Sequence, residues 1–197
     1  MRTEALRAAV SRHDQKGYDG KLAYRHYGTA EPVVTLLHRF GAVELDPCSN
    51  DHSIVGAAVE CRYHGGLSRP WLELAPNLSR PRHFAYVNSE YGQVLADRWV
   101  PRVIAEHRAG IEVVQLVPAR FDTGWWRQLR TAAARVAVVR GRLQFIRPRR
   151  KRSPALFPSA LFYLGPRADE FEALFSELAD VYRWQRATTR KQRSLQP

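Results

Sequence analysis

Short apolar stretches alternate with amphipathic helical patterns along most of this chain, and this alternation constrains its fold more than any other feature. The segment 29–41 has apolar residues at helical spacing between a possible N-cap, Thr29, and a possible helix stop, Gly41. The segments 83–87 and 111–117 are mostly apolar runs of strand length. Strands that are joined through helices pair in parallel and are covered on both faces. We therefore predict an α/β sandwich with a mostly parallel sheet that finishes in an antiparallel pair.

The remaining elements follow from the same patterns. Strands are expected at 43–46, 136–139, 143–146 and 160–164, and helices at 94–108, kinked near Pro101, at 124–134 and at 171–182. Residues 52–82 mix turn signals with apolar residues and are expected to form loops with short strands. A chain of 197 residues needs only one domain. We predict an arm over 1–22, a single domain over 23–184 and a flexible basic tail over 185–197.

The charge of the chain indicates a polyanionic partner. It has 31 Lys+Arg against 19 Asp+Glu, a net charge of +12, and 27 of the basic residues are arginine. An arginine-rich genome would also give this excess, but arginine forks suit phosphate and clustering favours the partner. Five basic residues fall within six positions, Arg147, Arg149, Arg150, Lys151 and Arg152, and a second group occupies 183–193. For each cluster the alternative is a solvated loop or tail.

Several classes of protein are disfavoured by what the sequence lacks. No apolar run approaches the roughly 20 residues of a membrane span, and the N-terminus lacks the apolar core of a signal peptide. Cys48 and Cys61 have neither zinc-like nor redox-pair spacing, so we expect reduced thiols in a cytoplasmic protein. The histidines show no metal-ligand spacing, and neither a P-loop nor a G-x-S-x-G elbow occurs. We expect no metal, no membrane partner and, for the oligomeric state, a monomer.

Polar clusters follow three of the predicted strands at the point where each strand ends. They are Asp46–Asn50, Asn88–Tyr91 and Arg120–Thr123. In open α/β sheets, ligands bind at the carboxyl ends of the strands. The three clusters are therefore expected to contribute to one site.

The cluster Asn88–Tyr91 has the residue types of a nucleobase site. The oxygen of Asn88 can accept a hydrogen bond from an exocyclic amine, and Tyr91 can stack on the face of a flat ring. The alternative is an ordinary strand followed by a polar turn that Gly92 closes. Trp125 and Trp126, which follow the third cluster, fit a core better than a stacking platform.

Seven short segments, in order between residues 24 and 165, resemble the phage-type DNA N-6-adenine methyltransferases. This family is a Dam-like branch of the Rossmann-like methyltransferases that depend on S-adenosylmethionine. Leu45-Asp46-Pro47-Cys48 is similar to the family's Leu-Asp-Pro-Cys, and Val87-Asn88-Ser89-Glu90-Tyr91 lies on its Val-Asn-Pro-Pro-Tyr. Gly65-Gly66-Leu67 resembles its Asp-Gly-Leu with glycine in place of the acid. The segments are 27–32, 45–49, 66–71, 87–92, 116–126, 141–145 and 157–161.

The resemblance implies S-adenosylmethionine as the cofactor and DNA as the partner. The residues that it implies for the cofactor are Thr29, Asp46, Pro47, Cys48 and Asn88, with Asp46 binding amino or hydroxyl groups. For Asp46 the alternative is a helix cap or a surface acid. Cys48 fits a buried lining residue better than a nucleophile, because no His-containing partner motif adjoins it.

The catalytic segment that the resemblance implies is Asn88, Ser89, Glu90 and Tyr91. In the family, the Asn side chain and the next backbone carbonyl accept from the amine of a flipped adenine. Ser89 retains that carbonyl, but the two prolines of the family are replaced by Ser89 and Glu90. Glu90 is expected either to accept the surplus proton or to pair with an arginine.

The residues expected to contact DNA are Arg120, Arg142, Arg147, Arg149, Arg150, Lys151 and Arg152. For Arg120, an internal salt bridge with Asp122 is the alternative. The prediction for the whole chain is an S-adenosylmethionine-dependent methyltransferase that acts on the exocyclic amine of adenine in DNA. Transfer to the amine of cytosine, and a catalytically impaired relative that only binds DNA, are the alternatives.

Overall fold

A computed structural model of the chain describes residues 28–62, 64–146 and 152–184. The predicted arm over 1–22 and the tail over 185–197 lie outside the described residues and remain predictions. The elements are, in chain order, α2 (Glu31–Phe40), β1 (Ala42–Ser49), β2 (Val59–Arg62), the short 3-10 turn η2 (Gly65–Leu67), α3 (Trp71–Leu74), the 3-10 turn η3 (Pro76–Ser79), β3 (His83–Val87), the π-helical segment η4 (Leu95–Trp99), α4 (Val100–Arg108), β4 (Val113–Pro118), α5 (Gly124–Ala132), β5 (Arg135–Val139), β6 (Gln144–Ile146), β7 (Arg152–Pro154), β8 (Ser159–Leu164), α6 (Ala168–Phe175) and β9 (Ala179–Tyr182).

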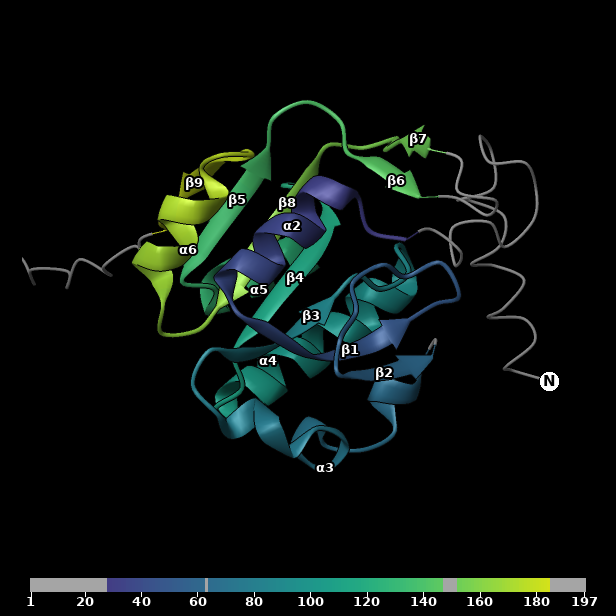
Figure 1. Ribbon diagram of the computed structural model, residues 1–197. Coiled ribbons are helices and arrows are strands. Elements are labelled where there is room, and N and C mark those ends of the chain that lie inside the picture. The colour runs from purple at the N-terminus through teal and green to yellow at the C-terminus, as the bar shows by residue number, and fades with distance from the viewer. Residues whose placement is uncertain (1–27, 63, 147–151, 185–197) are drawn as a thin grey trace, which may run out of the picture.

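Seven strands form one twisted sheet in the order β2-β1-β3-β4-β8-β5-β9 (Figure 1). The strands from β2 to β4 pair in parallel, whereas the pairs that involve β8 or β9 are antiparallel. The predicted α/β class with an antiparallel end is thus confirmed. The parallel part is smaller than expected, because three of the six neighbouring pairs are antiparallel.

Helices cover both faces of the sheet and bury two apolar cores (Figure 1). On one face, α2 and α6 pack over side chains such as Phe84 and Tyr86 of β3. On the other face, η4, α4 and α5 pack over the alternate residues Ala85 and Val87. Successive side chains of a strand point to opposite faces, so β3 serves both cores and must be apolar throughout.

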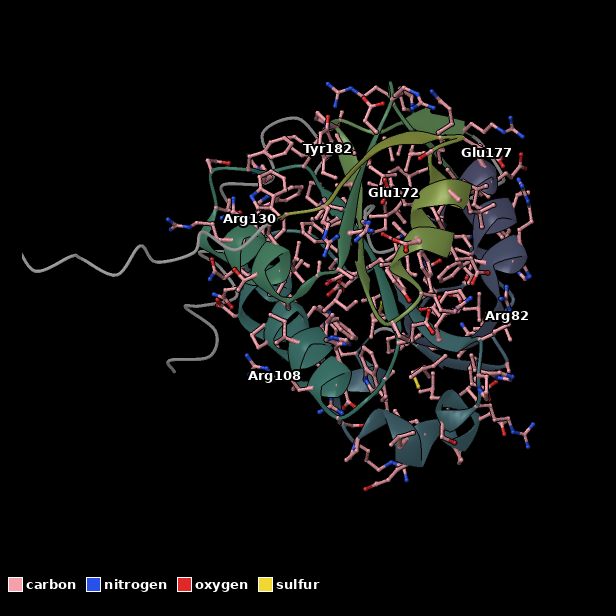
Figure 2. The ribbon with its side chains drawn as sticks, turned by 90° about the vertical axis from the view of Figure 1, so that its left-hand side faces the viewer. Arg82, Arg108, Arg130, Glu172, Glu177 and Tyr182 are labelled. Atoms are coloured by element: carbon pink, nitrogen blue, oxygen red, sulfur yellow. The ribbon has the colours of Figure 1, made fainter. Side chains whose placement is uncertain are left out.

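Arginine–carboxylate pairs hold α6 in place at the outer edge of its face. Arg135 of β5 donates from Nε to Glu172 Oε2 over 2.5 Å, and Arg39 of α2 donates from Nη1 to Glu177 Oε2 over 2.6 Å. Glu172 lies on α6, and Glu177 follows shortly after its end (Figure 2). These contacts tie the last helix to the helix and the strand beside it.

Two boundaries differ from the prediction because pairing between distant segments overrides the local pattern. β1 continues through Ser49, beyond the predicted end of the strand at residue 46, since its last residues still pair with β2. The predicted helix 171–182 is wrong beyond Phe175, because Ala179–Tyr182 pairs with β5 as strand β9. Near Pro101, where a kink was predicted, the π-helical segment η4 passes into α4, with the proline in the first turn of α4.

The strands β6 and β7 form a separate two-stranded hairpin. It contacts the body of the domain through a bridge between Gly28 and Ile146 and through an ion pair of Arg152 with Glu31, Nη2 to Oε2 2.6 Å. The tip of this hairpin, 147–151, lies outside the described residues. In the part of the chain that the structure describes, no helix combines the length and the apolar character that a membrane crossing requires.

Candidate active site

The carboxyl ends of β1 and β3 adjoin at a topological switch point of the sheet. The chain leaves β1 for β2 on one side and then returns past β1 to form β3 on the other side. The connections that leave the two strands therefore diverge, and ligands bind in the crevice between them. The predicted clusters 46–50 and 88–91 both lie here, and the cluster 120–123 follows the adjacent strand β4.

Asn88 has its amide oriented by two buried hydroxyls. Its Nδ2 donates to Thr29 Oγ1 over 3.1 Å, and Thr29 Oγ1 lies 3.0 Å from the hydroxyl of Tyr86. Because the nitrogen is engaged, Oδ1 is turned the other way and can accept a hydrogen bond from a ligand. Thr29 does not cap α2, contrary to expectation: the N-cap is Ala30, with no side-chain capping bond.

Tyr91 adjoins this acceptor. Its side chain is half-buried against the core under α4 and α5, and its hydroxyl lies 3.5 Å from Asn88 Oδ1. A hydrogen bond of that length is weak, and an amide oxygen has two lone pairs. Asn88 Oδ1 therefore retains its capacity to accept from an amine.

Asp46 is a buried acid on β1. Its carboxylate accepts from the backbone N–H of Cys48 over 3.1 Å, and the side chain is 4% exposed. Burial raises the pKa of Asp46 to about 7; the hydrogen bond from Cys48 opposes the rise, and the charge of Glu60 on β2 adds to it. A carboxyl group with a pKa near 7 can ionise when a ligand binds. The carboxylate can then bind a cationic or hydroxyl group of that ligand.

Cys48 lies between the two strand ends. Burial raises the pKa of its thiol well above the usual range, while a hydrogen bond with the backbone of Asn88 opposes that rise. Nucleophilic cysteines have lowered pKa values. The buried thiol therefore lacks this property of a nucleophile, and its role as a lining residue stays a prediction.

Pro47 and Ser49 lie near the carboxyl end of β1. A Cβ atom on Gly66 would lie 2.2 Å from Cβ of Pro47, so only glycine lets η2 approach β1 this closely. Ser49 is buried, and its Oγ has no hydrogen-bond partner among the described residues. Buried polar atoms normally have partners. A ligand hydroxyl or amine would satisfy this one.

Glu90 pairs with a histidine, whereas the sequence suggested an arginine. His64 Nε2 lies 2.5 Å from Glu90 Oε2, and the two side chains are 33% and 10% exposed. The His64 ring also lies against buried Trp99, with 6.5 Å between the ring centroids. His64 was missed because no metal spacing singled it out. The available signal was its place beside Gly65-Gly66-Leu67, which resembles a family motif.

The basic residues predicted to contact DNA are exposed where the structure describes them. Arg120 lies over the ring of Phe157, 4.8 Å from its centroid, and no ion pair joins it to Asp122 within the described ranges. Arg142 and Arg152 are exposed as well. The expected contacts through Arg147, Arg149, Arg150 and Lys151 fall on residues outside the described part of the chain.

Two further features bear on ligand binding. A cavity of about 450 Å³ lies beside the site, between the start of α2, the loop after β1 and the hairpin β6–β7. Its lining residues are Glu31, Asp51, His52, Ser53, Ile54, Ile146 and Arg152. Across 28–62, 64–146 and 152–184, no group of three or more His, Cys, Asp or Glu is arranged to hold a metal ion.

The fold and the site together define a class of protein. A helix-covered sheet with the reversed strand β8 between β4 and β5, and with an amide and a buried acid at its switch point, is that of a Rossmann-like methyltransferase. The chain belongs to the DNA N-6-adenine-methyltransferase (Dam) family, whose model matches residues 26–164. No curated protein and no solved structure matches the chain.

Proposed function

We propose that this protein transfers a methyl group from S-adenosylmethionine to the exocyclic amine of adenine in DNA. The observation that carries the proposal is the orientation of Asn88. Thr29 engages its nitrogen, so its oxygen is presented beside Tyr91 as an acceptor for an amine. Membership of the family supports adenine as the base.

Two acceptors would hold the amine. Asn88 Oδ1 would accept one of its hydrogens and the backbone carbonyl of Ser89 the other. An amine held in this way has its lone pair directed out of the ring plane, toward the methyl group. When bound, S-adenosylmethionine supplies a methyl group on a positively charged sulfur, which an amine can attack. Preorganised acceptors lower the barrier because they need no rearrangement during the reaction.

The residues at the end of β1 fit the cofactor. A carboxyl group of raised pKa, Asp46, and a hydroxyl that has no hydrogen-bond partner among the described residues, Ser49, lie buried on the strand next to β3. The cofactor carries hydroxyl, ammonium and sulfonium groups, all of which suit an acid. Binding a cation there would favour the ionised form of Asp46.

The target adenine must flip out of the DNA double helix to reach the site. Extruding a base costs a few kcal/mol, and stacking on an aromatic ring offsets about 1–3 kcal/mol of it. Tyr91 is proposed as that ring. Phosphate contacts from exposed arginines, including Arg120, Arg142 and Arg152, would contribute the sequence-independent part of the affinity.

Incubation with plasmid DNA and a labelled methyl donor tests the proposal. The DNA is then digested to nucleosides and the products are identified by mass. We expect label in N6-methyladenine. Label in N4-methylcytosine would move the reaction to the other amine-bearing base. DNA binding without methylation, and without cofactor binding in calorimetry, would contradict the proposal and favour a DNA-binding relative without catalysis.

A further inference from the structure

The segment 88–91 carries the proposed catalytic groups but lies outside any helix or strand. It connects the end of β3 to the helical turns of η4, and its sequence has serine and glutamate where the resembled family has two prolines. Proline restricts the backbone by fixing φ. Without it, another restraint must hold the Ser89 carbonyl and Asn88 in a productive geometry.

His64 lies on a turn that is itself firmly anchored. The backbone N–H of Leu67 donates to the His64 carbonyl over 3.0 Å, and Trp71 Nε1 donates to the Gly66 carbonyl over 2.8 Å. Trp71 is fully buried, and Gly66 packs against Pro47 with no space for a side chain. The turn is therefore fixed to β1, the strand that carries Asp46.

The contact from this turn reaches directly into the catalytic segment. His64 Nε2 and Glu90 Oε2 are 2.5 Å apart, although 26 residues separate them in the sequence. The Glu90 side chain is only 10% exposed. Breaking the pair would leave a largely desolvated carboxylate without this donor, which is costly. The pair thus links the turn beside β1 to the segment that follows β3, and breaking it costs free energy.

We infer that His64 is a positioning residue, which holds the segment 88–91 in its catalytic geometry through Glu90 in place of the rigidity of prolines. The inference rests on the proposed methyl transfer for its effect on rate. Its structural part, the restraint of the segment, does not depend on activity. Misplacing a reacting group by about 1 Å can cost about 100-fold in rate.

The test compares His64→Ala and His64→Gln with the wild-type enzyme, using plasmid DNA and S-adenosylmethionine. We expect His64→Ala to lower kcat by about 10- to 100-fold while the Kd of the cofactor changes little. Glutamine places an amide nitrogen near the position of Nε2, so His64→Gln should retain most of the rate. An unchanged kcat in His64→Ala, or equal losses in both variants, would overturn the inference.

The variant Glu90→Pro provides a second background in which the effect of His64→Ala is measured. In Glu90→Pro the segment is restrained by its own backbone, so adding His64→Ala should cause no further loss of kcat. The same loss in both backgrounds would mean that His64 acts otherwise than through Glu90. The matched control is His83→Ala, which removes the imidazole from a second histidine–glutamate pair, remote from the site, and should leave kcat unchanged.

Amide hydrogen exchange separates this inference from the proposed function. His64→Ala should accelerate exchange at 88–91, whereas His83→Ala should not, and this holds whether or not the protein methylates DNA. A wild-type protein without transferase activity would contradict the proposed function alone. Unchanged exchange at 88–91 in His64→Ala would contradict the restraint alone.

Discussion

A histidine–glutamate pair stands at each end of β3, and the two pairs differ in what they join. At the amino end, His83 Nδ1 lies 3.0 Å from Glu44 Oε2, and the side chains are 24% and 6% exposed. At the carboxyl end, His64 and Glu90 have similar exposure. The first pair joins two neighbouring strands, β3 and β1. The second joins a turn to an irregular segment.

The same pair of residue types has different consequences at the two ends of a parallel strand. At the amino end of β3, both partners lie on neighbouring strands of the sheet, with Glu44 at a register shift of β1 against β3, so the pair adds stability to a region that the sheet already joins. At the carboxyl end the connections diverge at a switch point, and side-chain contacts must do what the sheet does elsewhere. We expect contacts such as that between His64 and Glu90 to set the geometry of the segment 88–91 that methyl transfer requires.

The largest effect is expected for Asn88→Ala at the carboxyl end. Removal of the oriented acceptor should lower methyl transfer by at least about 100-fold, since single preorganised groups have effects of that size. Cofactor binding, measured by calorimetry, should be largely retained. Asn77→Ala, in η3 just before the amino end of β3, is the matched control and should transfer at the wild-type rate. Unchanged turnover in Asn88→Ala would remove this site from the mechanism.

The next largest effect is the pH dependence of stability that Asp46 causes. Asp46 lies on β1, the strand next to β3. Its pKa is raised to about 7 from an ordinary value of 3.8, so the folded state binds a proton that the unfolded state has lost between these values. Stability should therefore decline as pH rises from about 4 to 7, by at most about 1.4 kcal/mol per pH unit, and then level off.

Asp46→Asn should remove this decline, which denaturant titrations at several pH values would reveal. The control for the loss of one carboxyl group is Asp97→Asn, at an exposed acid that accepts from Gln93 Nε2 over 2.7 Å. If wild-type and Asp46→Asn proteins showed parallel stability curves, burial would not shift the titration of Asp46.

A smaller effect is expected for Gly66→Ala, which tests whether the turn of His64 must approach β1 closely. The added methyl group would meet both Cβ and the carbonyl oxygen of Pro47, so we expect a loss of about 1–3 kcal/mol in the free energy of unfolding. Gly124→Ala is the control, because a Cβ there meets nothing within 4 Å. Equal stability of the two variants in urea would show that η2 can move away from β1 freely.

The smallest effect is expected for the basic residues that are predicted to contact DNA. Neutralising Arg149, Arg150 and Lys151 should reduce the log–log slope of DNA binding against salt by about 2–3 units, if each contacts a phosphate. The control neutralises Arg80 and Arg108, which are exposed near the amino ends of β3 and β4; Arg108 points away from the body of the molecule in Figure 2. An unaltered slope in the first variant would make its cluster a solvated loop.

The sequence predicts well those features that depend on neighbours in the chain. Asp46 and Asn88 were proposed as site residues because each was expected at the end of a strand, where such sheets bind their ligands, and the structure places them on β1 and directly after β3. Cys48 was assigned to the lining because no His-containing motif adjoins it in the sequence. The buried strand β3 needed only the run 83–87 to be recognised.

Features that depend on distant partners could not be predicted. The apolar spacing at 171–182 fits a helix, yet pairing with β5 converts its last part into a strand. The links of Asn88 to Thr29 and of Glu90 to His64 join residues 59 and 26 positions apart. Neither link leaves a periodic trace in the sequence, so both required the fold.

The most direct test of the proposed function is a crystal structure of the protein with S-adenosylhomocysteine bound. The proposed function predicts that the ligand lies between the carboxyl ends of β1 and β3, within hydrogen-bonding distance of Asp46, with its sulfur facing Asn88. A ligand that contacts neither Asp46 nor Asn88, for example one held wholly in the cavity beside the hairpin β6–β7, would contradict it.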